Sequence, residues 1–220
     1  MSQERQEIIK CPKCGAEGEF AIWDSINVDL NPELKEKILN EELFLWICPK
    51  CGAKVFVPSG TIYHDMKRKY MLFFYFDESK DGAKETEIEI PEMFASLGDY
   101  QFRIVHGLMD MKEKIFCLEA GVNDIAVEYM KYMMRHFTYK EEISDEDDIR
   151  FGGLCQDEKD GQLLSVFAVL GPEERKGTLE LPISIYESCL TKVLSDPRLC
   201  TSKGVEVNEK WIESKLKGIC

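Results

Sequence analysis

Apolar positions follow two different periods along the chain, and together they predict a mixed α+β fold. The run Tyr70–Phe76 is apolar without interruption, so we expect a strand in the centre of a sheet with both faces covered. Shorter strands are predicted at Thr61–Asp65 and Tyr100–His106. Ile88 and Ile90 alternate with glutamates, which predicts one more extended segment.

Helical spacing appears in several other segments. Leu108–Ala120 has apolar residues every three or four positions and is followed by Gly121, so a helix is predicted to end there. A second helix is predicted after a cap at Asn123 or Asp124. A DNA-binding helix-turn-helix motif is a weaker interpretation of these two helices, because the second helix has no basic recognition face. Further helices are expected from Pro32 after a cap at Asn31, over Pro182–Leu194 and over Asn208–Lys217.

Charge divides the chain into three predicted parts. Residues 140–149 contain the run Glu-Glu-Ile-Ser-Asp-Glu-Asp-Asp, which repels itself and predicts an acidic linker. Residues 7–139 are expected to form the larger domain, with a ribbon over 7–60 and a mixed sheet with a helix pair over 61–139. Residues 150–220 are expected to form a smaller α+β unit. The strands expected in that unit are Ile149–Cys155, Leu163–Leu170 and Thr178–Leu181.

The hexapeptide Cys-Pro-Lys-Cys-Gly-Ala occurs twice, over residues 11–16 and 48–53. Each copy is a C-x-x-C pair, and two such pairs supply the four thiolates of a tetrahedral zinc site. Gly15 and Gly52 suit the tight turn because glycine adopts positive φ without strain. β-prone residues flank both copies, which is the pattern of a zinc ribbon with a helical insertion between its hairpins. The predicted ligands of one structural Zn²⁺ are Cys11, Cys14, Cys48 and Cys51.

Other interpretations of the cysteines are weaker. A redox dithiol needs one C-x-x-C pair, whereas this chain contains two identical pairs. Disulfides are disfavoured because the first twenty residues carry no apolar secretory region, so we expect a reducing compartment. The remaining cysteines have no ligand spacing and are expected to be small buried residues or free thiols; they are Cys117, Cys155, Cys189, Cys200 and Cys220.

The chain is acidic, with a formal net charge of -13. This charge disfavours nonspecific binding to nucleic acid or to anionic membranes. No apolar run reaches the roughly 18 residues of a membrane span, so we expect a cytoplasmic protein without a membrane segment. A local contact with nucleic acid stays open, because residues 1–76 carry 10 Lys and Arg against 11 Asp and Glu. The run Lys67-Arg68-Lys69 is more typical of a solvated turn than of a phosphate clamp.

Several motifs occur in order along the first two thirds of the chain. Trp23–Leu30 reads Trp-Asp-Ser-Ile-Asn-Val-Asp-Leu, Tyr63–Arg68 reads Tyr-His-Asp-Met-Lys-Arg, and Arg103-Ile104-Val105 precedes the helix that ends at Gly121. With the two Cys-Pro-x-Cys pairs, these segments resemble the bacterial CpXC family over residues 7 to about 135. The resemblance implies a zinc-ribbon protein without an assigned activity. It supports the metal and the fold and leaves the biochemistry open.

Catalysis has few candidate residues. The chain contains three histidines, and the pair His64-Asp65 is the suggestive one, since it could orient a water or bind a second metal. The alternative is a turn in which Asp65 caps the following segment and His64 bonds to the backbone. A tetrathiolate zinc has no open position for a substrate. We therefore expect a binding or scaffold protein that serves a protein partner. The first alternative is an enzyme with a site at His64 and Asp65. A zinc ribbon that binds nucleic acid is the less favoured alternative.

Overall fold

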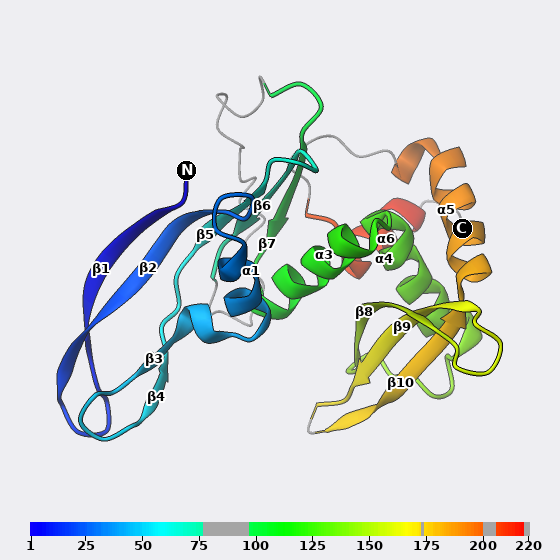
Figure 1. Cartoon of the computed structure of the whole chain (residues 1–220). Coiled ribbons are helices and arrows are strands. Elements are labelled where there is room, and N and C mark those ends of the chain that lie inside the picture. Colours follow the sequence, from blue (N-terminus) through cyan, green and yellow to red (C-terminus); the bar gives the residue numbers. More distant parts are fainter. Residues whose placement is uncertain (77–96, 173, 200–205, 218–220) are drawn as a thin grey trace. The chain divides into compact units, whose positions relative to one another are not determined.

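The computed structural model describes residues 1–76, 97–172, 174–199 and 206–217 (Figure 1). The described residues divide into two compact units, the first within residues 1–112 and the second within residues 113–199 and 206–217. Both units combine helices with sheets, so the predicted α+β class is confirmed. The predicted linker at 140–149 rests on charge alone and stays a prediction. The extended segment expected around Ile88 and Ile90 lies outside the described residues.

The first unit is built on a mixed sheet with the strand order β1-β2-β5-β6-β7 (Figure 1). The β2–β5 and β6–β7 pairs are parallel, and the β1–β2 and β5–β6 pairs are antiparallel. The predicted mixed sheet is thus present. Its strands are β1 (Gln3–Lys10), β2 (Glu17–Asn27), β5 (Thr61–Asp65), β6 (Tyr70–Phe74) and β7 (Gln101–Val105).

Strand β6 is buried along its whole length. On one face of the sheet Met71 and Phe73 pack with Phe102 in an apolar cluster. On the opposite face the ring of Phe74 meets that of Phe44 edge-on, with 5.5 Å between centroids. The prediction of a central strand with both faces covered is confirmed, because side chains that alternate along β6 find apolar partners on both sides.

Between β2 and β5 the chain makes a helical insertion. Helix α1 (Pro32–Leu39) begins with proline in its first turn and buries Leu34 and Ile38. The predicted cap was wrong at Asn31, whose side chain makes no cap hydrogen bond to the helix. A 3₁₀ turn, η1 (Glu42–Phe44), then leads to a two-stranded hairpin formed by β3 (Leu45–Ile47) and β4 (Lys54–Phe56).

The second unit contains an antiparallel sheet and several helices. Its strand order is β10-β9-β8, and Phe151 and Phe167 pack edge-on in its core at 5.4 Å between ring centroids. Within the described residues, no helix has the length and apolar character needed to cross a bilayer. The remaining elements of this unit are β8 (Asp148–Gln156), β9 (Leu163–Leu170), β10 (Arg175–Pro182), α5 (Ile183–Ser195), η3 (Pro197–Leu199) and α6 (Glu209–Leu216).

The predicted helix pair forms as expected. Helix α3 (Leu108–Ala120) ends at Gly121, which has a φ of 65°. Helix α4 (Asp124–Met133) is capped by Asn123, whose Oδ1 accepts from the N–H groups two and three residues ahead at 2.9 and 3.2 Å. The last turn then widens into a π-helix, η2 (Met134–Thr138), which no local pattern had indicated.

Charged side chains are buried between α3 and α4. Lys131 Nζ lies 3.1 Å from a Glu113 carboxylate oxygen, and Lys114 Nζ lies 3.0 Å from Glu128 Oε1 and 3.3 Å from Asp124 Oδ2. All five residues are at most 5% exposed. Burial alone would lower the pKa of Lys131, but the charges of Glu113 and Glu128 outweigh it and raise that pKa. These lysines therefore stay charged, and each acts as the counterion of a buried carboxylate.

Replacing Asn123 by alanine should destabilise the second unit by about 1 kcal/mol, because two N–H groups at the start of α4 lose their acceptor. Denaturant unfolding followed by circular dichroism measures the change. Asn31→Ala is the matched control, since that side chain caps nothing and its loss should cost less. Equal losses at the two positions would contradict the assignment of Asn123 as a cap.

Candidate metal centre

Two hairpin tips present the four cysteines. Residues 11–16 connect β1 to β2, and residues 48–53 connect β3 to β4. In the first tip Cys11 N–H donates to Ala16 O at 2.8 Å and Gly15 N–H donates to Cys11 O at 2.9 Å. The second tip repeats both bonds at 2.9 Å. The glycines have φ of 71° and 68°, so the repeated hexapeptide folds into two copies of one turn that only glycine adopts without strain.

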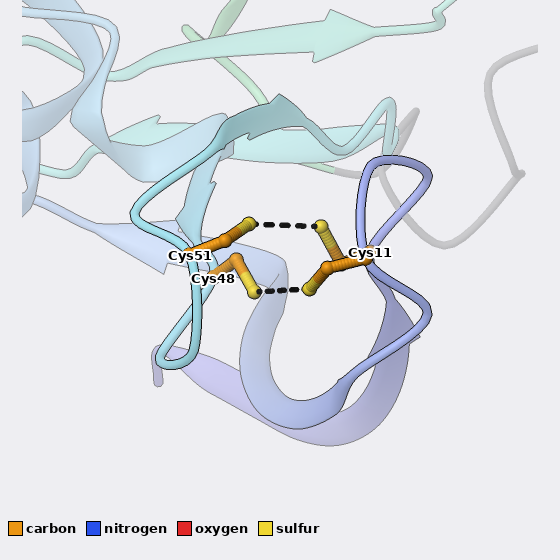
Figure 2. Close-up of side chains that lie close together, drawn as sticks. Cys11, Cys48 and Cys51 are labelled. Carbon is orange, nitrogen blue, oxygen red and sulfur yellow. Dashed lines mark hydrogen bonds between the residues drawn. The ribbon is translucent and has the colours of Figure 1, made fainter.

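The four sulfurs converge between the tips. Cys11 Sγ lies 3.6 Å from Cys51 Sγ, and Cys14 Sγ lies 3.6 Å from Cys48 Sγ; Figure 2 shows the labelled Cys11 facing Cys48 and Cys51 from the opposite loop. All four sulfurs lie within 4.8 Å of one another. Sulfurs bound at about 2.3 Å to a tetrahedral ion would be about 3.8 Å apart. The donor set and its spacing therefore fit a metal ion, and the structure brings together the four cysteines expected from the sequence.

Cys48 and Cys14 differ in how readily they ionise. Burial works against the thiolate of Cys48, but the N–H groups of Cys51 and Lys50 donate to its sulfur and lower its pKa to about 6. Ala16 supplies a similar bond to Cys14, yet burial and the neighbouring sulfurs outweigh it and raise the pKa of Cys14 to about 12. Four negative charges cannot share this space by themselves. A divalent cation would remove the repulsion and hold all four sulfurs as thiolates.

A small apolar cluster packs beneath the sulfurs. Cys11 and Cys48 are each 2% exposed and lie among buried side chains that include Ile22 and Trp46. The Trp46 ring passes so close to Gly18 that a Cβ at that glycine would be 2.9 Å from Cζ2. A side chain at this position would force the rigid ring of Trp46 to shift, which explains why β2 has glycine here.

The cysteines in the described residues are free thiols. The sulfur pairs at the centre are 3.6 Å apart, far beyond the roughly 2.05 Å of a disulfide bond. Cys117 is buried, whereas Cys155 and Cys189 are partly exposed, as expected for residues outside a ligand set.

His64 and Asp65 are adjacent in β5, so their side chains point to opposite faces of the sheet. Asp65 is 2% exposed, and its carboxylate accepts from Arg68 N–H at 2.9 Å and from the Arg68 guanidinium at 2.7 Å. His64 Nε2 lies 3.1 Å from the hydroxyl of Tyr100. Burial and the positive chain terminus lower the pKa of His64. The two side chains have separate partners and do not form a dyad.

Asp29 is the residue that sequence reasoning missed. Its Oδ2 accepts from the N–H groups of Met66 and Lys67 at 2.8 and 3.0 Å. Just before it, Val28 N–H donates to His64 O at 3.0 Å. The segment Trp23–Leu30 is therefore bonded directly to the segment that contains His64. The sequence offered one weak signal: Asp29 is the second-to-last residue of the first motif, and basic residues lie at the end of the second.

The basic run 67–69 is neutralised within the turn that joins β5 to β6. Its three cations reach three different carboxylates, at 2.7 to 3.2 Å. The pairs are Lys67–Asp29, Arg68–Asp65 and Lys69–Asp99. Since each cation has an acidic neighbour, the turn has little positive charge left for a phosphate, as the sequence interpretation of a solvated turn expects.

A cavity of about 380 Å³ lies against strands β2 and β5 of the first unit. It is lined by His64 and by residues that share its face of the sheet, among them Ser25, Asn27, Ile62 and Met71. Ser25 Oγ donates to the carbonyl of Met1, and Asn27 Nδ2 donates to Met66 Sδ. The polar groups at the cavity are therefore mostly engaged in contacts within the first unit.

Comparison with known proteins gives one family. A family model described as CpXC protein matches residues 9–131, which is more than half of the chain. No curated protein and no solved structure matches it. The match covers both cysteine pairs, the segments that Asp29 joins, and the helices α3 and most of α4.

Replacing Asp29 by alanine should lower the stability of the first unit, because the N–H groups of Met66 and Lys67 lose their acceptor. Burial opposes the ionisation of Asp29, but the N–H groups of Lys67 and Met66 and the ammonium of Lys67 outweigh it and lower the pKa of Asp29 from the ordinary value of an aspartate. Its contribution is therefore present above the unfolded pKa and is lost as the pH falls through the folded pKa.

Denaturant unfolding at neutral pH and in strongly acidic solution measures this effect. The difference between the parent and Asp29→Ala should shrink as the solution becomes acidic. Asp24→Ala is the control, since Asp24 is 44% exposed and pairs with Arg5 at the surface. A difference for Asp29→Ala that does not change with pH would refute the role of its carboxylate.

Proposed function

The chain belongs to the CpXC family, and from that premise we propose that its four cysteines hold one structural Zn²⁺. The observation that carries the proposal is the convergence of Cys11, Cys14, Cys48 and Cys51 at tetrathiolate spacing. Thiolate donors in a tetrahedral arrangement select Zn²⁺ among the common divalent ions. The two hairpins then form a zinc ribbon, with α1 inserted between them.

The ion is needed because the hairpins can bury little apolar surface. Strands β3 and β4 have three residues each, and the apolar cluster around Trp46 is small. A two-stranded hairpin of this length is marginal in water. Metal binding to a site that is absent from the unfolded chain adds its free energy to folding.

The same centre is a poor catalyst. Four protein thiolates would fill the coordination shell and leave no position for water or substrate. We therefore propose that the protein acts by binding. In this proposal it is a cytoplasmic scaffold whose acidic surface recognises a protein partner. The net charge of -13 and the neutralised basic turn support a protein partner over nucleic acid.

Zinc analysis of the purified chain should find one ion that survives gel filtration. Cys11→Ser should lose this ion and unfold residues 7–60, which would appear as faster amide exchange of β1 to β4. Cys155→Ser is the matched control, because this cysteine lies outside the cluster, and it should keep both the zinc and the exchange pattern. A folded, metal-free parent protein would end the proposal.

A site at His64 is the second candidate function, and the cavity that His64 lines is the observation in its favour. Asp65→Ala should destabilise the first unit by about 1.5–3 kcal/mol, since Asp65 bonds to a charged partner. His64→Ala should leave stability nearly unchanged. If His64→Ala also leaves the cellular phenotype of the protein intact, the enzyme interpretation fails; loss of that phenotype in a stable His64→Ala protein would favour it.

A further inference from the structure

A second group of metal-ligating side chains lies in the second unit, outside the residues that match the family. His136 is in the π-helix η2, and Glu209 and Glu213 are in α6. The His136 nitrogen and one carboxylate oxygen of each glutamate all lie within 4.8 Å of one another. We propose that these three side chains bind a second divalent metal ion, which fastens α6 to η2.

The secondary structure brings the three side chains together. Glu209 and Glu213 are four residues apart in α6, so they share one face of the helix. Helix α6 is held in place by its cap, where Asn208 Oδ1 accepts from Trp211 N–H at 2.8 Å, and by Ile212, which is fully buried. His136 comes from a widened turn of a kind often found at functional sites in helices.

One pair of these ligand atoms already has the separation expected for two donors bound to the same ion. His136 Nε2 lies 3.1 Å from Glu213 Oε1. A nitrogen and an oxygen bound to one ion at about 2.0–2.2 Å, at angles of about 90–109°, lie about 3.0–3.4 Å apart. The ion can therefore replace the shared proton between these two atoms with little movement of either side chain.

Neighbouring cations hold both carboxylates in place. Arg135 donates to both oxygens of Glu209, from Nε to Oε1 at 2.5 Å and from Nη2 to Oε2 at 3.0 Å, and Nη2 also donates to the carbonyl of Asp147 at 2.8 Å. Each carboxylate oxygen has two lone pairs, so Glu209 can bind a metal ion through a lone pair that Arg135 does not use. Such outer-shell bonds fix the direction of a ligating carboxylate. Lys217 Nζ lies 2.9 Å from Glu213 Oε2, and its side chain is 74% exposed, so it can swing into solvent when an ion binds.

The local charges favour a cation. The positive charge of Arg135 is opposed by Asp145 and Asp147 as well as by Glu209. Carboxylates therefore outnumber cations around the cluster. The charged groups that face one another there are Arg135, Lys176 and Lys217 against Asp145, Asp147, Glu209 and Glu213.

The donor types indicate which ion fits. One imidazole and two carboxylates suit the divalent transition metals and zinc better than Ca²⁺ or Mg²⁺. The ligand side chains are 17% to 35% exposed, so an ion can enter from solvent and water can fill its remaining positions. This site would differ from the tetracysteine centre, since three protein ligands leave coordination positions open.

Equilibrium dialysis of the full chain against buffered free zinc, followed by metal analysis, tests the proposal. The parent protein should take up two ions, the second more weakly than the first. His136→Gln should keep the first ion and lose the second, because glutamine keeps a polar contact to Glu213 but is a poor ligand. His106→Gln, the control in the first unit, should still take up two ions.

Thermal unfolding without added zinc checks that His136→Gln is as stable as the parent. Glu213→Gln provides an independent ligand variant and should also lose the second ion. The proposal is overturned if the parent takes up a single ion at every zinc concentration. It is also overturned if His136→Gln and Glu213→Gln, both folded, still take up two.

Discussion

The first unit depends on bringing together sulfurs from two turns that are far apart in sequence. Residues 15–47 separate the two pairs, and they include the strand β2, the helix α1 and the strand β3. The parallel pairing of β2 with β5 needs a crossover between them, and the insertion that carries the second hairpin supplies it. Contact between the two hairpin tips therefore also restricts the positions at which β2 can end and β5 can begin in the sheet.

Much of this architecture follows from local patterns. The unbroken apolar run at β6, the glycine after α3 and the asparagine before α4 each specify an element through interactions within a few residues. Asn31 shows the limit of such reasoning. Its composition and position suit a cap, yet the helix begins at Pro32 without a side-chain bond, because proline already sets the first turn.

Long-range partners could not be predicted. Nothing near Asp29 in sequence shows that its carboxylate accepts from a turn beyond residue 65, nor that His136 meets two glutamates of α6. The four cysteines were the exception, because two identical hexapeptides, each with a C-x-x-C pair, predict that both pairs bind the same ion. Two of the segments that carry the family resemblance, Trp23–Leu30 and Tyr63–Arg68, are bonded to each other at the β5–β6 turn, which their order in the sequence does not reveal.

The charged layer between α3 and α4 also restricts how the sequence can change. Glu113 accepts from the backbone N–H of Phe151 in β8 at 2.7 Å as well as from Lys131, so one carboxylate joins two helices and a strand. A shift of either helix by one turn would leave a charge without its counterion in a dry interior. A substitution at one of these positions is therefore tolerated only if its charged partner changes too. The buried charges thus restrict the two helices to a single alignment.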